Sequence, residues 1–87
     1  MNHLSEKEML AMARNLLQSS AALHEEALPG DGEGVYVCEM IMGGRGLMVA
    51  PDASVLFADS SMSFDEQLEA FRRGVRTPLG TRENDKA

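Results

Sequence analysis

Arginine is the residue type in this chain whose placement comes closest to a recognition site. Arg45 follows Gly43 and Gly44, and glycine amides beside a guanidinium group can cradle a phosphate. Phosphate loops of that kind lead from a strand into a helix, whereas these glycines stand between two apolar runs. The pattern therefore favours a hairpin turn, with ligand contact through Arg45 as the alternative.

A second basic group lies near the C-terminus, at Arg72, Arg73, Arg76 and Arg82. Such a group can bind a carboxylate, a phosphate or an acidic protein. Cations are also expected at the end of a helix, because they offset the negative end of its dipole. We favour this structural or intersubunit role, and we keep Arg72, Arg73 and Arg76, together with Arg45, as candidate binding residues.

Nucleophiles and metal ligands occur without the partners that they need. His24 and the two glutamates that follow it lack a second spaced histidine or cysteine to complete a zinc site. Cys38 lies within an apolar run, where a thiol is expected to be buried and inert. No serine stands in the strand-turn-helix setting of a nucleophile elbow. The sequence thus predicts no catalytic residue, metal site or cofactor, and we do not expect an enzyme.

Size and charge narrow the class of protein. A chain of 87 residues fits one domain near the lower size limit for a single hydrophobic core. We expect that domain over residues 1–76 and a flexible tail over residues 77–87. The net charge is −6, and the acidic excess falls in the first half of the chain. This distribution disfavours nucleic acid as a partner, because phosphate binding needs clustered lysine and arginine.

Signals for export or membrane insertion are missing from the sequence. Cys38 has no second cysteine to pair with, and polar residues interrupt the apolar stretch near the N-terminus. No segment approaches the roughly 20 apolar residues that span a bilayer. We therefore expect a cytoplasmic location and no membrane partner.

Helix signals flank the middle of the chain. Residues Ser5 to Glu8 form a capping box, and the apolar stripe behind it predicts a helix from about Glu6 to His24. Residues 25–34 are rich in glycine and carboxylates, and a surface loop is predicted there. A second capping box, from Ser63 to Glu66, predicts a helix from about Phe64 to Arg73.

Between the helices, short apolar runs separated by turn residues predict a three-stranded antiparallel meander. Gly43-Gly44 supplies the first turn, and Pro51 begins the second, for which three residues are favoured over four. A three-residue turn puts Ala53 in the left-handed conformation that glycine usually takes. The expected strands run from Val35 to Met42, from Leu47 to Ala50 and from Val55 to Ala58.

If Gly43-Gly44 is the whole first loop, both faces of the meander are apolar. Something besides the two helices must then cover one face, so we expect a homodimer joined through a sheet face or an exposed edge. One face carries Tyr36, Cys38, Met40, Leu47 and Val49, and the other carries Val35, Val37, Ile41, Met48 and Ala50. The candidate interface residues are Val35, Val37, Ile41 and Met48.

The predicted fold class is α+β, with a helix, a three-stranded meander and a second helix. The predicted function is a small acidic, non-catalytic protein-binding module acting as a homodimer: an adaptor, an inhibitor, or an immunity-type or chaperone-like protein. The chain has seven methionines, and Met40, Met42 and Met48 fall in the predicted sheet, which indicates either a Met-rich core or an adaptable binding surface. The alternative is a small-ligand or anion-binding regulator that uses the arginines.

Overall fold

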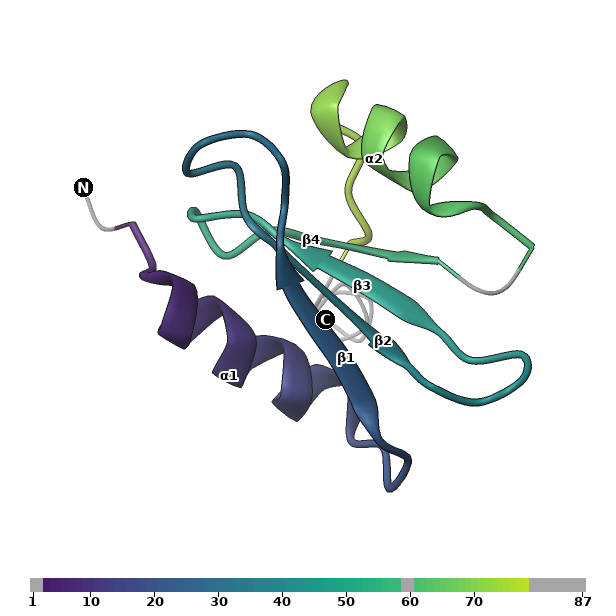
Figure 1. Ribbon diagram of the computed structural model, residues 1–87. Helices are drawn as coiled ribbons and strands as arrows, with labels where there is room; N and C mark the ends of the chain where they lie inside the picture. Colours follow the sequence, from purple (N-terminus) through teal and green to yellow (C-terminus); the bar gives the residue numbers. More distant parts are fainter. Residues whose placement is uncertain (1–2, 59–60, 79–87) are drawn as a thin grey trace, which may run out of the picture.

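The computed structural model describes residues 3–58 and 61–78, in which a four-stranded antiparallel sheet lies between two helices (Figure 1). The strands follow one another across the sheet in chain order, and one helix covers each face. The predicted α+β class is therefore confirmed. The elements are α1 (Glu6–Leu17), β1 (Leu23–Ala27), β2 (Val35–Glu39), β3 (Gly46–Val49), β4 (Val55–Ala58) and α2 (Phe64–Arg72).

Each face of the sheet has its own hydrophobic core, because successive side chains of a strand point to opposite faces. The core beneath α1 comprises Met9, Ala13, Leu17, Val35, Val37, Leu47, Val49 and Val55. The core beneath α2 comprises Leu28, Met48, Ala50, Leu56, Leu68, Ala70 and Phe71. Both apolar faces are therefore covered within a single chain.

Both predicted capping boxes form. The Ser5 hydroxyl accepts the Glu8 N–H at 3.2 Å, and the Glu8 carboxylate accepts the Ser5 N–H at 2.8 Å. The corresponding bonds between Ser63 and Glu66 measure 3.1 and 2.9 Å. Each box satisfies N–H groups that the first helical turn leaves unpaired. The predicted starts of both helices are therefore confirmed.

The first helix is shorter than predicted, and a fourth strand follows it. α1 ends at Leu17, and Gln18 takes a left-handed φ of 46°. The Ser19 hydroxyl then accepts the Ala21 N–H at 3.1 Å, a local bond that competes with helix continuation. The predictions of a helix reaching His24 and of only three strands are therefore wrong, because pairing with β2 satisfies the backbone groups of β1 instead.

The hairpin between β2 and β3 also differs from the prediction. The Glu39 N–H donates to the Arg45 carbonyl oxygen at 3.0 Å, so the chain between these residues is the loop, and a loop of Gly43-Gly44 alone is wrong. Val35 now lies opposite Val49. Because the register has shifted by an odd number of residues, β3 presents the reverse side chains to each face. The α1 face of the hairpin carries Val35, Val37, Leu47 and Val49.

The turn between β3 and β4 confirms the favoured prediction of a three-residue turn. Val49 lies opposite Val55, and Ala53 has a left-handed φ of 74°. That conformation is costly for a residue with a Cβ atom. The Asp52 carboxylate offsets part of the cost, because it accepts the Ser54 N–H at 3.0 Å and the Ser54 hydroxyl at 2.6 Å.

The four candidate interface residues do not share a face of the sheet. Val35 and Val37 are fully buried beneath α1, and Met48 is fully buried beneath α2. Of the four, Ile41 alone is exposed, over 55% of its surface. The prediction that an apolar sheet face is left for a partner is therefore wrong, since the two helices cover opposite faces and leave neither open.

The β4 edge of the sheet is occupied by the chain that follows α2. The Thr77 N–H donates to the Val55 carbonyl oxygen at 2.8 Å, and the Thr77 hydroxyl accepts the Phe57 N–H at 2.9 Å. Thr77 is the first residue of the predicted flexible tail, and these two bonds place it beside β4. Residues 79–87 of that tail lie outside the described residues.

Candidate functional site

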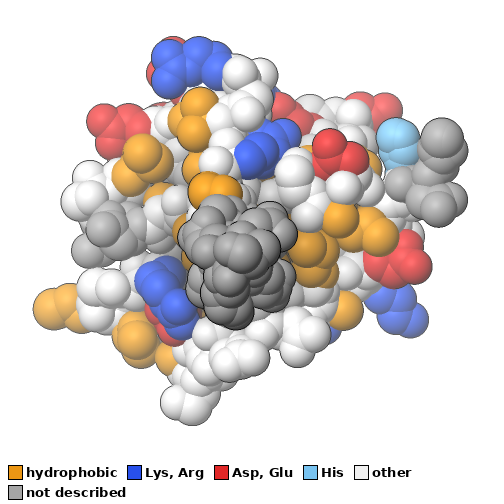
Figure 2. Space-filling model, turned by 180° about the vertical axis from the view of Figure 1, so that it is seen from behind, with side chains coloured by type: hydrophobic (Ala, Val, Ile, Leu, Met, Phe, Trp, Pro, Cys, Tyr) orange, Lys and Arg blue, Asp and Glu red, His pale blue; other side chains and the backbone are white. Residues whose placement is uncertain are grey.

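The loop between β2 and β3, residues 40–45, carries three consecutive apolar side chains that are open to solvent. Met40 is 62% exposed, Ile41 is 55% exposed and Met42 is 99% exposed. On the face shown in Figure 2, hydrophobic side chains reach the surface in separate places between charged groups of both signs, which is ordinary for a protein surface. Three in succession on one loop are a larger apolar feature and require an explanation.

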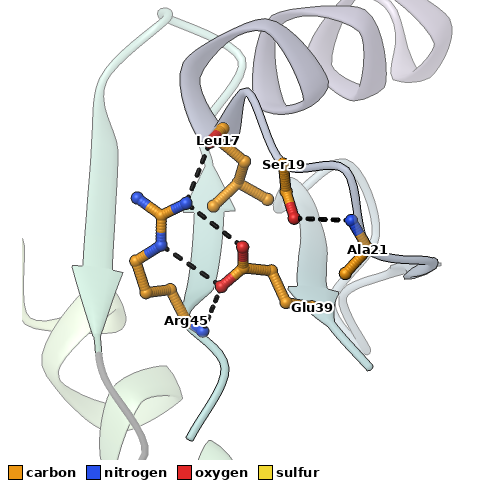
Figure 3. Close-up of polar contacts among 5 residues, drawn as sticks. All are labelled: Leu17, Ser19, Ala21, Glu39 and Arg45. Atoms are coloured by element: carbon orange, nitrogen blue, oxygen red, sulfur yellow. Dashed lines mark hydrogen bonds and ion pairs between the residues drawn. The ribbon is translucent and has the colours of Figure 1, made fainter. Parts of the chain in front are cut away.

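An ion pair holds the base of this loop (Figure 3). The Arg45 backbone N–H donates to the Glu39 carboxylate at 2.8 Å, and the Arg45 guanidinium donates to both carboxylate oxygens at 3.2 Å. The same guanidinium donates to the Leu17 carbonyl oxygen at 2.9 Å, at the C-terminal end of α1. Arg45 therefore joins β2, the loop and α1, and a cation at this helix end is also favourable for the helix dipole.

The electrostatics of the pair follow from these bonds. The hydrogen bonds from the Arg45 side chain, then from its backbone N–H and from Ser19, lower the pKa of Glu39 to about 2. The Glu39 carboxylate in turn raises the pKa of Arg45 above its ordinary value. Both groups are therefore charged throughout the physiological pH range. The Arg45 guanidinium, which the sequence suggested as a phosphate contact, is therefore already bonded within the chain.

Backbone bonds fix the shape of the loop as well. The Met40 N–H donates to the Ala22 carbonyl oxygen, and the Gly44 N–H donates to the Ile41 carbonyl oxygen, both at 2.9 Å. A Cβ atom added at Gly44 would lie 2.6 Å from the Glu39 carbonyl oxygen, so the chain passes too close here for any other residue. The loop is thus held in place while its apolar side chains stay in solvent.

Two of the candidate binding arginines line one cavity of about 360 Å³ beside the end of α2. Arg72 donates to the Glu33 carboxylate at 2.6 and 3.0 Å, and these bonds lower the pKa of Glu33. Arg76 donates to the Ser54 hydroxyl and to the Phe71 carbonyl oxygen, each at 2.8 Å. Its guanidinium also lies 3.9 Å from the centre of the Phe71 ring, as a cation–π contact.

The other two candidate arginines lie elsewhere. Arg45 is at the base of the β2–β3 loop, and Arg73 is exposed, with no side-chain hydrogen bond or ion pair within the described residues. The cavity that Arg72 lines also contains the carboxylates of Glu33 and Asp52. Among the described residues that line this cavity, two arginines and two carboxylates therefore balance each other.

The open edge of the sheet is β1. The Ala22 carbonyl oxygen bonds inward to Met40, and antiparallel pairing alternates inward and outward residues. The backbone groups of Leu23, Glu25 and Ala27 therefore point away from β2, and no further strand of the described chain lies beside them. Arg14 forms an ion pair with Glu25 at 2.6 Å along this edge, and the His24 ring is hydrogen-bonded to the Glu26 carboxylate at 2.9 Å.

The sequence patterns found Arg45 but missed its partner. Glu39 is the one charged residue of the predicted strand from Val35 to Met42, and a lone charge in an apolar run is the signal that points to a specific bond. Met40 and Met42 were predicted in that strand, which is wrong, because β2 ends at Glu39. Their exposure follows from the geometry of the loop, which the hydrophobic pattern of the sequence does not specify.

Comparison of the chain with protein-family models, with curated proteins and with solved structures gives no match. Within residues 3–58 and 61–78, no three His, Cys, Asp or Glu side chains are grouped so that they could hold a metal ion. None of the helices in this part of the chain is long and apolar enough to cross a membrane. The side chains and geometry of the molecule itself therefore carry the functional argument.

Proposed function

We propose that this protein is a small, acidic, non-catalytic protein-binding module that docks onto its partner through the β2–β3 loop. The observation that carries the proposal is the run of Met40, Ile41 and Met42 in solvent on a loop whose base is fixed by Arg45. A loop whose backbone is held in place before binding loses less conformational entropy on association. Methionine also adapts its shape to varied apolar surfaces.

The exposed side chains add little to the stability of the free chain. Met42 is 99% exposed, so it buries almost no apolar surface within the molecule, and surface burial is the source of hydrophobic stabilisation. The net charge of −6 would speed the approach to a basic partner, with the apolar loop then supplying contact area.

Paired substitutions test the docking loop. The double variant Met40→Ser with Met42→Ser is expected to melt like the wild type, because neither side chain is in a core. Immobilised wild type should enrich a protein from native-cell extract that the double variant does not retain, as mass spectrometry can measure. Met62→Ser is the matched control, since Met62 is 39% exposed and lies outside the loop. Identical enrichment by the double variant and the wild type would contradict the proposal.

We further propose that the module is a homodimer joined through β1. Three observations support this pairing: both sheet faces are covered by helices, Thr77 occupies the β4 edge, and the outward backbone groups of β1 are open.

Ala27→Pro removes one outward N–H group without breaking a bond to β2, which is where an edge strand tolerates proline. We expect light scattering to give a mass of twice 9.5 kDa for the wild type and the monomer mass for Ala27→Pro. A wild-type mass of 9.5 kDa at all concentrations would refute the dimer.

The anion-binding alternative rests on the cavity that Arg72 and Arg76 share. Against it, both guanidinium groups are bonded within the chain, and carboxylates line the same cavity. We expect inorganic phosphate to raise the Tm no more than chloride does at equal ionic strength. A phosphate-specific rise that disappears in Arg72→Gln would favour the alternative, because a ligand stabilises the state that it binds.

A further inference from the structure

We propose that the β2–β3 loop is a site of reversible methionine oxidation by peroxide, at Met42 first and at Met40 second, and that the resulting sulfoxides abolish docking by this loop. The modification follows from the structure of the free chain alone. Its effect on docking rests on the function proposed above.

The methionines of the described chain differ widely in exposure. Met42 is 99% exposed and Met40 is 62% exposed, whereas Met48 is fully buried and Met9 is 5% exposed. A thioether reacts only where the oxidant can reach the sulfur. The two buried methionines react only in molecules that open locally, so the chain contains its own unreactive controls.

The chemistry is a two-electron transfer of one oxygen atom. A lone pair on the thioether sulfur attacks a peroxide oxygen, the O–O bond breaks, a sulfur–oxygen bond forms, and hydrogen peroxide is reduced to water. The sulfoxide is returned to the thioether by a methionine sulfoxide reductase, with two thiols oxidised to a disulfide and one water released. Both directions balance without any group that the protein itself must supply.

The loop is built so that oxidation changes its surface and leaves the fold intact. A sulfoxide is polar and is destructive inside a core, but Met40 and Met42 contribute to neither core. The bonds that hold the loop run through Glu39, Arg45 and Leu17, and none involves a methionine sulfur. Oxidation therefore converts an apolar docking surface into a polar one on an unchanged scaffold.

Peptide mapping after graded exposure to hydrogen peroxide tests the site. We expect the sulfoxide to form on Met42 first and on Met40 next, with Met48 and Met9 at least about tenfold slower, since local opening of roughly 1.4 kcal/mol already gives that factor. Unfolding the chain in guanidinium should make all these rates similar. Equal rates in the folded chain, or Met48 reacting as fast as Met42, would overturn the proposal.

Retention on an apolar chromatography resin tests the change of surface. Oxidised protein should elute earlier than untreated protein with the same Tm, and treatment with the reductase and a dithiol should restore the original elution. Met42→Leu with Met40→Leu is the control, because leucine stays apolar and does not react. Elution that peroxide changes equally in this control, or that does not change in the wild type, would contradict the switch.

The docking proposal and the oxidation proposal fail in different experiments. Capture that survives Met40→Ser with Met42→Ser in untreated protein refutes docking by the loop. Capture that is lost in this variant but survives in fully sulfoxidised wild type refutes the regulation. Cys38 is only half-buried, so the comparison is repeated in Cys38→Ala, where the peroxide effect should persist.

Discussion

Replacing Glu39 by glutamine tests whether the ion pair at the base of the β2–β3 loop stabilises the fold. Glutamine has a similar shape but no negative charge and only one acceptor oxygen, so it cannot accept both of the bonds that the Arg45 guanidinium makes at 3.2 Å. The Glu39 side chain is only 9% exposed, whereas the Arg45 side chain is 46% exposed, so water replaces part of what the guanidinium loses. We expect a lower free energy of unfolding near neutral pH.

The size of the effect is read from its pH dependence. The pKa of Glu39 is lowered to about 2 in the folded chain, from an ordinary value of 4.5. Because the folded pKa is the lower one, the stabilisation is complete above the ordinary value and is lost as the pH falls through about 2. Between these two values the unfolded chain binds close to one more proton at this position. The wild type should therefore lose stability more steeply than Glu39→Gln in this window.

Urea unfolding followed by circular dichroism, from neutral pH down to about 2, measures both expectations. The pKa values of Glu25, Glu33 and Asp52 are also lowered, so all variants should share a common loss of stability in acid. Glu69→Gln, on the exposed side of α2, is the control and should follow the wild type. Parallel curves for the wild type and Glu39→Gln across this window would refute the reasoning.

Three other substitutions test the packing around the sheet, each by urea unfolding. Gly34→Ala places a Cβ atom 2.2 Å from the Val49 carbonyl oxygen, at a φ of 144°. We expect the free energy of unfolding to fall by roughly 2–4 kcal/mol, and an unchanged urea midpoint would contradict this. Gln67→Leu removes a buried bond to the Leu56 carbonyl oxygen of 2.8 Å and should cost about 1–3 kcal/mol; a more stable variant would show that packing outweighs the bond. Ser63→Ala removes the α2 cap and should cost about 1 kcal/mol, whereas no loss would mean that the cap is not needed.

Local chemistry was sufficient to predict the helix starts and the second turn. A capping box uses residues within one helical turn, so Ser5 and Ser63 mark their helices without any knowledge of the rest of the fold. The turn at Ala53 was also predictable, because Pro51 and Asp52 restrict the backbone there. These features depend on neighbours in the sequence, and the structure agrees with them.

Pairing between residues far apart in the chain determines the features that local sequence patterns did not predict. The residues of β1 fit a helical stripe through Leu23, and they become a strand only because β2 supplies bonds beside them. At the end of the β2–β3 loop, Arg45 contacts both Glu39 and Leu17, and the Leu17 carbonyl group lies in a different element. No periodicity encodes such a contact.

In the candidate site, too, local features were predicted from the sequence and long-range features were not. The sequence identified Arg45 and the surplus of methionines as notable, but it placed Met40 and Met42 in the sheet and not on a loop. Burial of Val35 and Val37 beneath α1 depends on which face each helix takes, and amphipathic patterns do not specify that choice. The exposed loop became recognisable only when the end of β2 was known.

The position of Thr77 makes the proposed assembly self-limiting. A sheet with two open edges can add copies without end, whereas Thr77 occupies backbone groups of Val55 and Phe57 along one edge. In the described chain this leaves β1 as the open edge. When a second copy pairs with β1, neither copy has an open edge left for a third. Loss of the Thr77 bonds would turn a finite pair into a unit that can polymerise, with each copy offering one edge and accepting another.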